Sequence, residues 1–194
     1  MRYNAQHKEL TRRKVLDAAA RAIRRQGPEC VSVASVMAKV GLTHGGFYAH
    51  FDSKEAMITA SIEHMFEQIE ERMNSLAEGK SAQLAVCCYI NAYLSDRHLR
   101  ERELGCPIAA LGSDLPRLGE SARKAFASGM SSVHKKISAL LKSMGAEDAD
   151  DAARSLQSEL LGALLSARLV KACDRKKVLE VTRRSLKRRF VIGN

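Results

Sequence analysis

Long apolar runs are missing from this chain of 194 residues. No stretch approaches the roughly 18 consecutive apolar residues that a membrane-spanning helix needs. The first ten residues, MRYNAQHKEL, also lack the apolar core of a signal peptide. These absences argue against a membrane protein and a secreted precursor, and we expect a cytoplasmic protein without membrane contact.

Cysteine patterns for metal binding are missing as well. In the cytoplasm the thiols should be reduced, and an odd number of cysteines does not fit a disulfide framework. The chain has no nucleophile elbow, no phosphate-cradling glycine loop and no HExxH motif. We therefore expect no enzyme, no cofactor and no metal site. The five cysteines show no CxxC or other metal spacing: Cys30, Cys87, Cys88, Cys106 and Cys173.

Proline is scarce, with only three residues, and β-branched runs are few. This composition favours helices throughout, and 45% hydrophobic residues suffice for a sizeable core. No internal repeat and no linker rich in Gly, Ser or Pro interrupts the chain. Apolar periodicity and breaker residues predict helices over about 9–26, 33–40, 43–51, 53–78, 84–94, 117–144, 148–171 and 174–190, with one short helix between 105 and 116.

What the chain has in excess is positive charge. The net charge is +10, which points toward a polyanionic partner. Residues 1–54 carry ten Lys/Arg against four Asp/Glu, and residues 171–189 carry nine against two. In the first helix we expect Arg12, Arg13, Arg21, Arg24 and Arg25 to face solvent or DNA. The second basic block fits a solvated helix face better than a second nucleic-acid site.

Residues 33–55, VASVMAKVGLTHGGFYAHFDSKE, read as a helix-turn-helix. Val33, Val36, Met37 and Val40 form one apolar stripe, and Ser32 stands where an N-cap belongs. Gly41 supplies the stop, and Thr43 can cap a second helix two residues later. Leu42, Phe47 and Phe51 give that helix its inner side. Two short helices joined by a tight turn place the second in the major groove.

Two glycines on the second helix point to close contact with a partner. Gly45 and Gly46 each cost a helix about 1 kcal/mol relative to Ala. They make sense where phosphates or base edges approach the backbone. The alternative is an ordinary helical hairpin whose glycines relieve crowding.

The stretch GLTHGGFYAHFDSKEAM resembles the recognition helix and linker of the TetR family of transcriptional repressors. The resemblance covers about a quarter of the chain. It implies a three-helix DNA-binding head, residues 1–52, followed by a helical ligand-binding and dimerisation domain, residues 53–194. The fold is thus expected to be all-α, and the partners to be a double-stranded DNA operator, a second copy of the chain and a small-molecule inducer.

The DNA contacts expected from this resemblance fall in two groups. Base reading falls to Thr43, His44 and Gly45, with Gly46 allowing close approach, but histidine has no unique base preference and the operator sequence stays open. The positions that carry phosphate contacts in the family are Ser32, Tyr48, His50 and Lys54, and Lys54 also lies in the first turn of the next helix. For Tyr48 a packing role is the alternative, and for Lys54 a free surface charge.

The second domain should hold a pocket between its middle helices. The low aromatic content, 5%, favours a small apolar cavity over a broad aromatic one. Any of the large side chains near it is equally explained as plain core. The candidates for lining this pocket are Phe66, Tyr89, Tyr93, Cys106, Phe126 and Met130.

Cys106 has two readings. It lies between Gly105 and Pro107 at a helix start, where partial positive charge and nearby Arg100 and Arg102 would favour the thiolate. The segment LGCPIAALGSDL resembles the same region of TetR-like proteins that sense electrophiles or oxidants through a cysteine. The alternative is a buried structural cysteine, which the burial habits of cysteine favour.

Dimerisation is expected through the last two helices. The helix over about 148–171 carries an apolar, small-residue surface that we expect one chain to leave uncovered, and two copies would form a four-helix interface. The predicted interface residues are Leu156, Leu160, Ala163, Leu164 and Ala167.

Two classes of function remain at this point. The first is a DNA-binding repressor that responds to a small molecule or, through Cys106, to an electrophile or oxidant. The second is an all-helical protein whose basic faces bind RNA or acidic partners without sequence choice. The helix-turn-helix favours the first, and the sequence leaves activator and repressor roles open.

Overall fold

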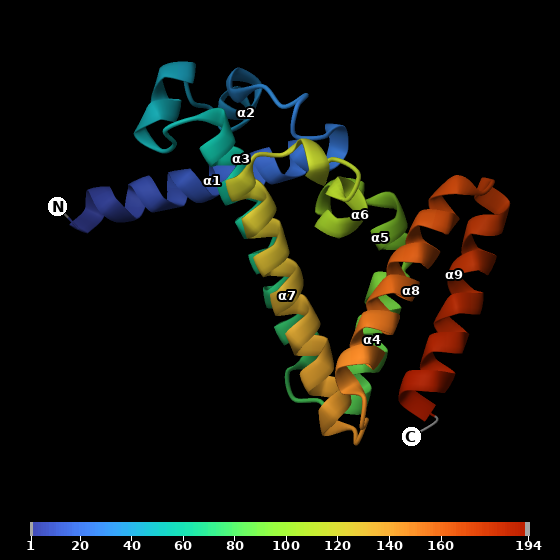
Figure 1. The fold of residues 1–194 in the computed structure, drawn as a ribbon. Coiled ribbons are helices and arrows are strands. Elements are labelled where there is room, and N and C mark those ends of the chain that lie inside the picture. Colours follow the sequence, from blue (N-terminus) through green and yellow to red (C-terminus); the bar gives the residue numbers. More distant parts are fainter. Residues whose placement is uncertain (1, 193–194) are drawn as a thin grey trace.

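The computed structural model describes residues 2–192, and all of its regular elements in that range are helical (Figure 1). The first three elements form a small unit at one end. They are α1 (Arg2–Gln26), α2 (Val33–Lys39) and the 3₁₀ helix η1 (His44–Ala49). The predicted all-α fold is confirmed. No helix among the described residues is both long and apolar enough to cross a membrane.

The remaining elements form the larger part of the molecule. Long helices alternate there with short turns, as the breaker residues predicted. In chain order they are α3 (Lys54–Ala77), α4 (Ala82–Tyr93), α5 (Asp96–Arg100), η2 (Arg102–Leu104), α6 (Pro107–Leu111), η3 (Leu115–Arg117), α7 (Glu120–Ser143), α8 (Ala149–Leu169), α9 (Ala172–Lys187) and a final π-helical turn, η4 (Arg188–Ile192).

Glycine ends two of the helices in the head, as predicted. Gly27 follows α1 with φ +82°, and Gly41 follows α2 with φ +75°. Side chains other than glycine rarely adopt this left-handed conformation. Ser53 caps α3, its Oγ accepting a hydrogen bond from the Ala56 amide at 3.0 Å. The chain therefore passes from the head into α3 through a short, defined turn.

Helix α3 connects the two parts and packs along α1 on one side and α7 on another. Phe66 of α3 meets Phe126 of α7 edge-on, with ring centroids 5.3 Å apart. Gly129 lets the helices approach, because a Cβ there would lie 2.2 Å from the Phe66 ring. The core continues through α7, α8 and α9 (Figure 1).

Several boundaries differ from the sequence expectations. Helix α1 begins at Arg2, well before residue 9. The second motif helix is a 3₁₀ helix of six residues, since the two adjacent glycines weaken α-helix formation. Met130 was expected to face inward, yet it is 38% exposed. Asp174 does not cap α9 but lies in its first turn.

Candidate DNA-binding head and ligand cavity

The turn between α2 and η1 is built by two side-chain caps. The Ser32 hydroxyl accepts from the Ser35 amide at 3.4 Å, and the Thr43 hydroxyl accepts from the Gly46 amide at 3.3 Å. Beneath them, the Phe47 and Phe51 rings stack 5.6 Å apart, and both are buried. The buried rings thus stabilise the motif, and the side chains on its outer side are not needed for packing.

The predicted base-reading residues share this outer side. Thr43, His44 and Gly45 are exposed, and a Cβ on Gly45 would meet nothing within 4 Å. The fold of the chain therefore does not require a glycine at position 45. Gly46 is half-buried, and a Cβ there would lie 3.7 Å from the Thr43 hydroxyl.

The predicted phosphate-binding residues differ in exposure and contacts. Ser32 is exposed and Tyr48 is 65% exposed, so Tyr48 is not a core packing residue. His50 is half-buried, and burial, followed by nearby Lys8 and Arg12, lowers the pKa of its imidazole. Lys54 lies in the first turn of α3, and its Nζ donates to the Glu29 carbonyl at 2.9 Å. Lys54 is thus engaged within the chain, in addition to its place at a helix start.

The basic face of α1 departs from the prediction at two positions. Arg12 is half-buried, and its guanidinium lies 5.0 Å from the centroid of the Phe51 ring. Arg13, Arg21 and Arg25 are exposed as predicted, whereas Arg24 is only 6% exposed. The expectation that Arg24 faces solvent or DNA was wrong. Its guanidinium reaches across to α3 and η2, donating to Gln68 Oε1 at 3.1 and 3.2 Å and to the Glu103 carbonyl at 3.4 Å.

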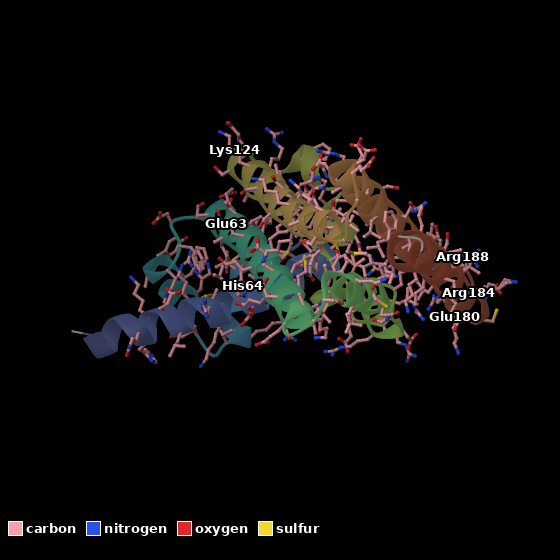
Figure 2. The ribbon with its side chains drawn as sticks, turned by 90° about the horizontal axis from the view of Figure 1, so that it is seen from below. Glu63, His64, Lys124, Glu180, Arg184 and Arg188 are labelled. Carbon is pink, nitrogen blue, oxygen red and sulfur yellow. The ribbon has the colours of Figure 1, made fainter. Side chains whose placement is uncertain are left out.

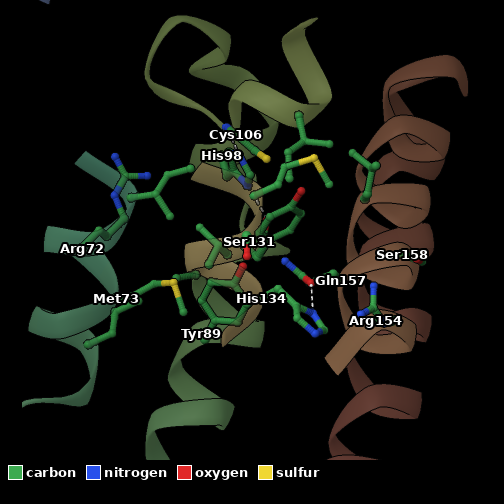
Figure 3. Close-up of a pocket in the computed structure, with 18 residues that line it drawn as sticks. Arg72, Met73, Tyr89, His98, Cys106, Ser131, His134, Arg154, Gln157 and Ser158 are labelled. Atoms are coloured by element: carbon green, nitrogen blue, oxygen red, sulfur yellow. Dashed lines mark hydrogen bonds between the residues drawn. The ribbon is translucent and has the colours of Figure 1, made fainter. Parts of the chain in front are cut away.

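A cavity of about 480 Å³ lies in the larger part, within the size range of small-molecule sites. Its walls come from α3, α4, α7 and α8, with the α5–α6 segment at one end (Figure 3). Four predicted residues line it: Tyr89, Tyr93, Cys106 and Met130. Phe66 and Phe126 do not, because they pack against each other between α3 and α7.

Most polar groups of the cavity were missed by the sequence analysis, since each stands alone on its helix without a motif. Charge and hydrogen-bonding capacity on an inner helix face were the only available signals. These residues are Arg72, His98, Ser131, His134, Arg154, Gln157 and Ser158. No cluster of three or more metal-ligating side chains occurs in the described part of the chain.

His98 fixes the α5–α6 end of the cavity. Its Nδ1–H donates to the Tyr93 carbonyl at 2.7 Å, and its Nε2 accepts from the Cys106 amide at 3.0 Å. The accepting Nε2 requires the neutral ring, and burial lowers the pKa of His98, which favours the same form. Cys106 is 7% exposed, and its thiol lies beside the Tyr93 hydroxyl. The hydrogen bonds of His98 therefore fix the positions of Tyr93 and Cys106 at this end of the cavity.

The predicted dimer residues lie in the core of the single chain. All five are at most 7% exposed, so the premise that one chain leaves them uncovered was wrong. Their helix face packs against neighbouring helices, including α7 and α9. The large apolar side chains that stay exposed on α8 and α9 are instead Leu165 (39%), Leu169 (87%) and Val181 (50%).

Exposed charged residues of α9 and η4 form an outer edge, whereas Arg183 is half-buried and donates to the Leu94 carbonyl. Glu180, Arg184 and Arg188, spaced four residues apart, are all exposed and follow that edge in Figure 2. Elsewhere on this segment Arg189 pairs with Glu159, and Lys176 pairs with Glu180 at 3.9 Å. Partial neutralisation by acidic neighbours fits a solvated helix face.

Comparison with known proteins also separates the head from the larger part of the chain. Residues 15–60 match the profile of bacterial regulatory proteins of the tetR family. The chain is similar to two uncharacterized HTH-type transcriptional regulators of Bacillus subtilis, YfiR (27% identity over 86 residues) and YvdT (35% over 65 residues). The YfiR alignment covers 44% of this chain and 42% of YfiR, and the YvdT alignment covers 31% of this chain and 34% of YvdT. The chain thus matches less than half the length of either relative.

Solved structures extend the likeness of the fold to nearly the whole chain. The reduced form of Escherichia coli NemR superposes with a TM-score of 0.81 at 21% identity, covering 92% of this chain and 96% of that one. A TetR family regulator from Agrobacterium tumefaciens gives 0.78 at 22% identity, covering 93% and 98%. The head thus matches the tetR family of bacterial regulatory proteins, and the chain as a whole has the fold of solved TetR family regulators.

Proposed function

We propose that this protein is a repressor that binds a near-palindromic operator as a homodimer and leaves it when a small molecule enters the cavity. The carrying observation is the position of α3. This one helix holds Lys54 at its start and Ile69, Arg72 and Met73 in the cavity wall. A ligand that moves the far part of α3 therefore acts directly on the head.

In this proposal Thr43, His44 and Gly45 read bases, and Gly46 allows the backbone to approach. Ser32, Tyr48, His50 and Lys54 bind phosphates. The open space at Gly45 supports this, because a glycine that the fold does not need is explained by a partner that comes close. The boundary between head and body falls at residues 52–53, immediately before α3.

Two substitutions separate the two kinds of DNA contact. Lys54→Ala should weaken binding to all duplexes and lower the salt slope by about one unit, since one phosphate contact is lost. His44→Ala should change the preference among operator variants instead. Binding selection from random duplexes, followed by titration at several salt concentrations, measures both effects. A wild-type selection without any enriched sequence would refute the proposal.

We further propose that dimerisation uses the exposed side of α8 and α9 around Leu165, Leu169 and Val181. An isologous contact there would cover the most exposed leucine of the chain and supply the two-fold axis that a palindrome requires. Leu169→Glu should yield folded monomers with poor operator affinity, which light scattering can detect. A wild-type chain that is monomeric at micromolar concentration contradicts this arrangement.

Release requires a difference in affinity between two states. A ligand that binds the DNA-competent and DNA-incompetent arrangements equally shifts nothing, however tightly it binds. The inducer must therefore fit the cavity best when α3 has moved. Screening small molecules for a thermal shift, followed by operator release, identifies such a ligand.

A thiol-based trigger at Cys106 is the second candidate, favoured by the position of this thiol in the cavity wall. Cys30 and Cys173 are exposed and would react with alkylating agents first. The comparison therefore uses a Cys30→Ser/Cys173→Ser background with and without Cys106→Ser. Release only when Cys106 is present identifies the trigger, and equal release of both proteins eliminates it.

A further inference from the structure

Charge in the cavity has one sign. Its 18 lining residues include two arginines and two histidines but no aspartate or glutamate. The remaining wall is largely apolar. The aliphatic and thioether side chains are Ile69, Met73, Leu76, Ala92, Ile108, Met130, Val133 and Leu161.

The two arginines come from different walls, Arg72 from α3 and Arg154 from α8 (Figure 3), and they differ in their partners. Arg154 of α8 pairs with Asp150 at 3.0 Å, and His134 bonds the same carboxylate at 2.5 Å. Arg72 of α3 has only the Leu104 carbonyl at 3.4 Å, and among residues 6–191 no carboxylate lies within ion-pair distance of it. Asp150 thus neutralises the charge at the Arg154 end of the cavity, whereas the charge at the Arg72 end has no such partner.

Two further arginines add to the charge at the Arg72 end. Burial, followed by the proximity of Arg72, lowers the pKa of Arg24 to about 10. Burial, followed by Arg102, lowers the pKa of Arg168, and the charge of Arg168 also acts on the wall residue His98. The Nε atoms of Arg24 and Arg168 are buried without a hydrogen-bond partner among the described residues.

Nothing in the wall at this end carries a compensating negative charge. After burial and its backbone hydrogen bond, the influences on His98 are the charges of Arg168, Arg72 and Arg24. The neighbouring phenols stay neutral, because burial, followed by nearby Cys106, raises the pKa of both Tyr89 and Tyr93. They are donors of hydrogen bonds and do not act as counter-ions.

We propose that the cavity takes an amphipathic small molecule with one carboxylate, whose anion lies at the end formed by Arg72, Tyr93 and His98. The apolar body lies along the aliphatic side chains that α3 and α7 contribute to the wall. A guanidinium matches a carboxylate in a two-pronged hydrogen bond, and the arriving anion relieves the mutual repulsion of the arginines. This inference rests on the proposed function and assigns a chemical class to its ligand.

A single introduced tryptophan makes the test direct. The chain has no tryptophan, so Met130→Trp places the sole indole at the cavity wall, where the native side chain is partly exposed. The probes are octanoate, octanol and octyltrimethylammonium, which share the same chain and differ in the head. Leu84→Trp, on an exposed site outside the cavity, is the reporter control.

Octanoate should change the fluorescence at a concentration at least about tenfold lower than octanol, and the ammonium probe should be weaker still. In the Met130→Trp background, Arg72→Gln should lower octanoate affinity about tenfold or more and leave octanol unchanged. Arg168→Gln should act in the same direction. Arg154→Gln is the matched control, because Asp150 already neutralises that arginine.

Three outcomes would overturn the carboxylate assignment. Octanoate and octanol could bind equally, the preference for octanoate could persist in both Arg72→Gln and Arg168→Gln, or none of the three probes could change the fluorescence. Operator binding, followed in parallel, separates this result from the proposed function. If octanoate binds with the expected preference but DNA affinity is unchanged, the ligand class stands and the release mechanism fails. If octanol and octanoate bind equally and both release DNA, the release mechanism stands and the carboxylate ligand class fails.

Discussion

Helix α3 has two contrasting sides. Toward α7 the Phe66 and Phe126 rings pack edge-on over Gly129, and Ser132 and Lys136 add hydrogen bonds to Glu70 and Asn74. Toward α1 it also carries a hydrogen-bonded seam. There the Asp17 carboxylate accepts from Gln68 at 2.9 Å and lies 2.8 Å from His64 Nε2, while the Gln68 carbonyl accepts from Arg24.

The two contacts respond differently to motion. A close-packed aromatic contact has one good arrangement, because small shifts cost dispersion energy or create clashes. A hydrogen-bonded seam can exchange partners among several donors and acceptors. This difference implies that α3 and α7 move as one body, and that adjustment between head and body takes place at the α1 seam.

The aromatic contact toward α7 is the more easily broken. Gly129→Ala should lower the free energy of unfolding by about 3 kcal/mol, because the new methyl group would lie 2.2 Å from the Phe66 ring. Gly162→Ala on α8 is the matched control. A Cβ there meets nothing within 4 Å, so alanine should stabilise the helix by about 0.5–1 kcal/mol. Urea denaturation of both variants measures this, and equal stabilities would contradict the packing argument.

In the seam toward α1 the two partners should respond unequally. Gln68→Ala removes the side-chain acceptor of a buried guanidinium and should cost about 1.5–3 kcal/mol. Arg24→Met removes the buried charge itself and should change stability by less than about 1 kcal/mol.

A double-mutant cycle completes this comparison. In the Arg24→Met background, Gln68→Ala should cost about 1–2 kcal/mol less than in the wild type, because no buried cation remains to be left without a partner. Additive effects of the two changes would show that the seam contact carries no coupling energy.

The smallest effect concerns pH. The pKa of His98 is lowered in the folded protein, chiefly by burial, so folding favours the neutral ring. The resulting stability is present above about pH 6.5, the pKa in the unfolded chain, and is lost as the pH falls toward the folded value. His98→Gln should reduce the loss of unfolding free energy between pH 7.5 and 5.5.

Because the pKa of His50 is also lowered, both proteins in that comparison should carry His50→Gln. Thermal or urea unfolding at the two pH values gives the difference. The same pH dependence with and without His98 would exclude this histidine as its source.

Local features of the fold could be predicted from the sequence. Gly27 and Gly41 marked helix ends because left-handed backbone is a local requirement. Val36 and Met37 marked the buried face of α2 by spacing alone. Tyr89, Tyr93 and Cys106 were expected near a pocket, and they line the cavity.

Features that depend on distant partners could not be predicted. Arg24 is buried because Gln68 and Glu103, far along the chain, receive its hydrogen bonds. Phe66 does not line the cavity, contrary to the prediction, because Gly129 lets α7 pack against its ring. Leu156 and Ala167 looked uncovered only because apolar periodicity shows that a face is buried without showing what buries it.

The length of α3 turns it into a lever. Its 24 residues span about 36 Å at 1.5 Å per residue. A tilt of about 5° at the cavity end would displace the other end by about 3 Å, close to the roughly 3.4 Å rise of one base pair. Angular changes smaller than a side-chain rotation in the cavity wall thus correspond to a full step along the DNA axis at the head.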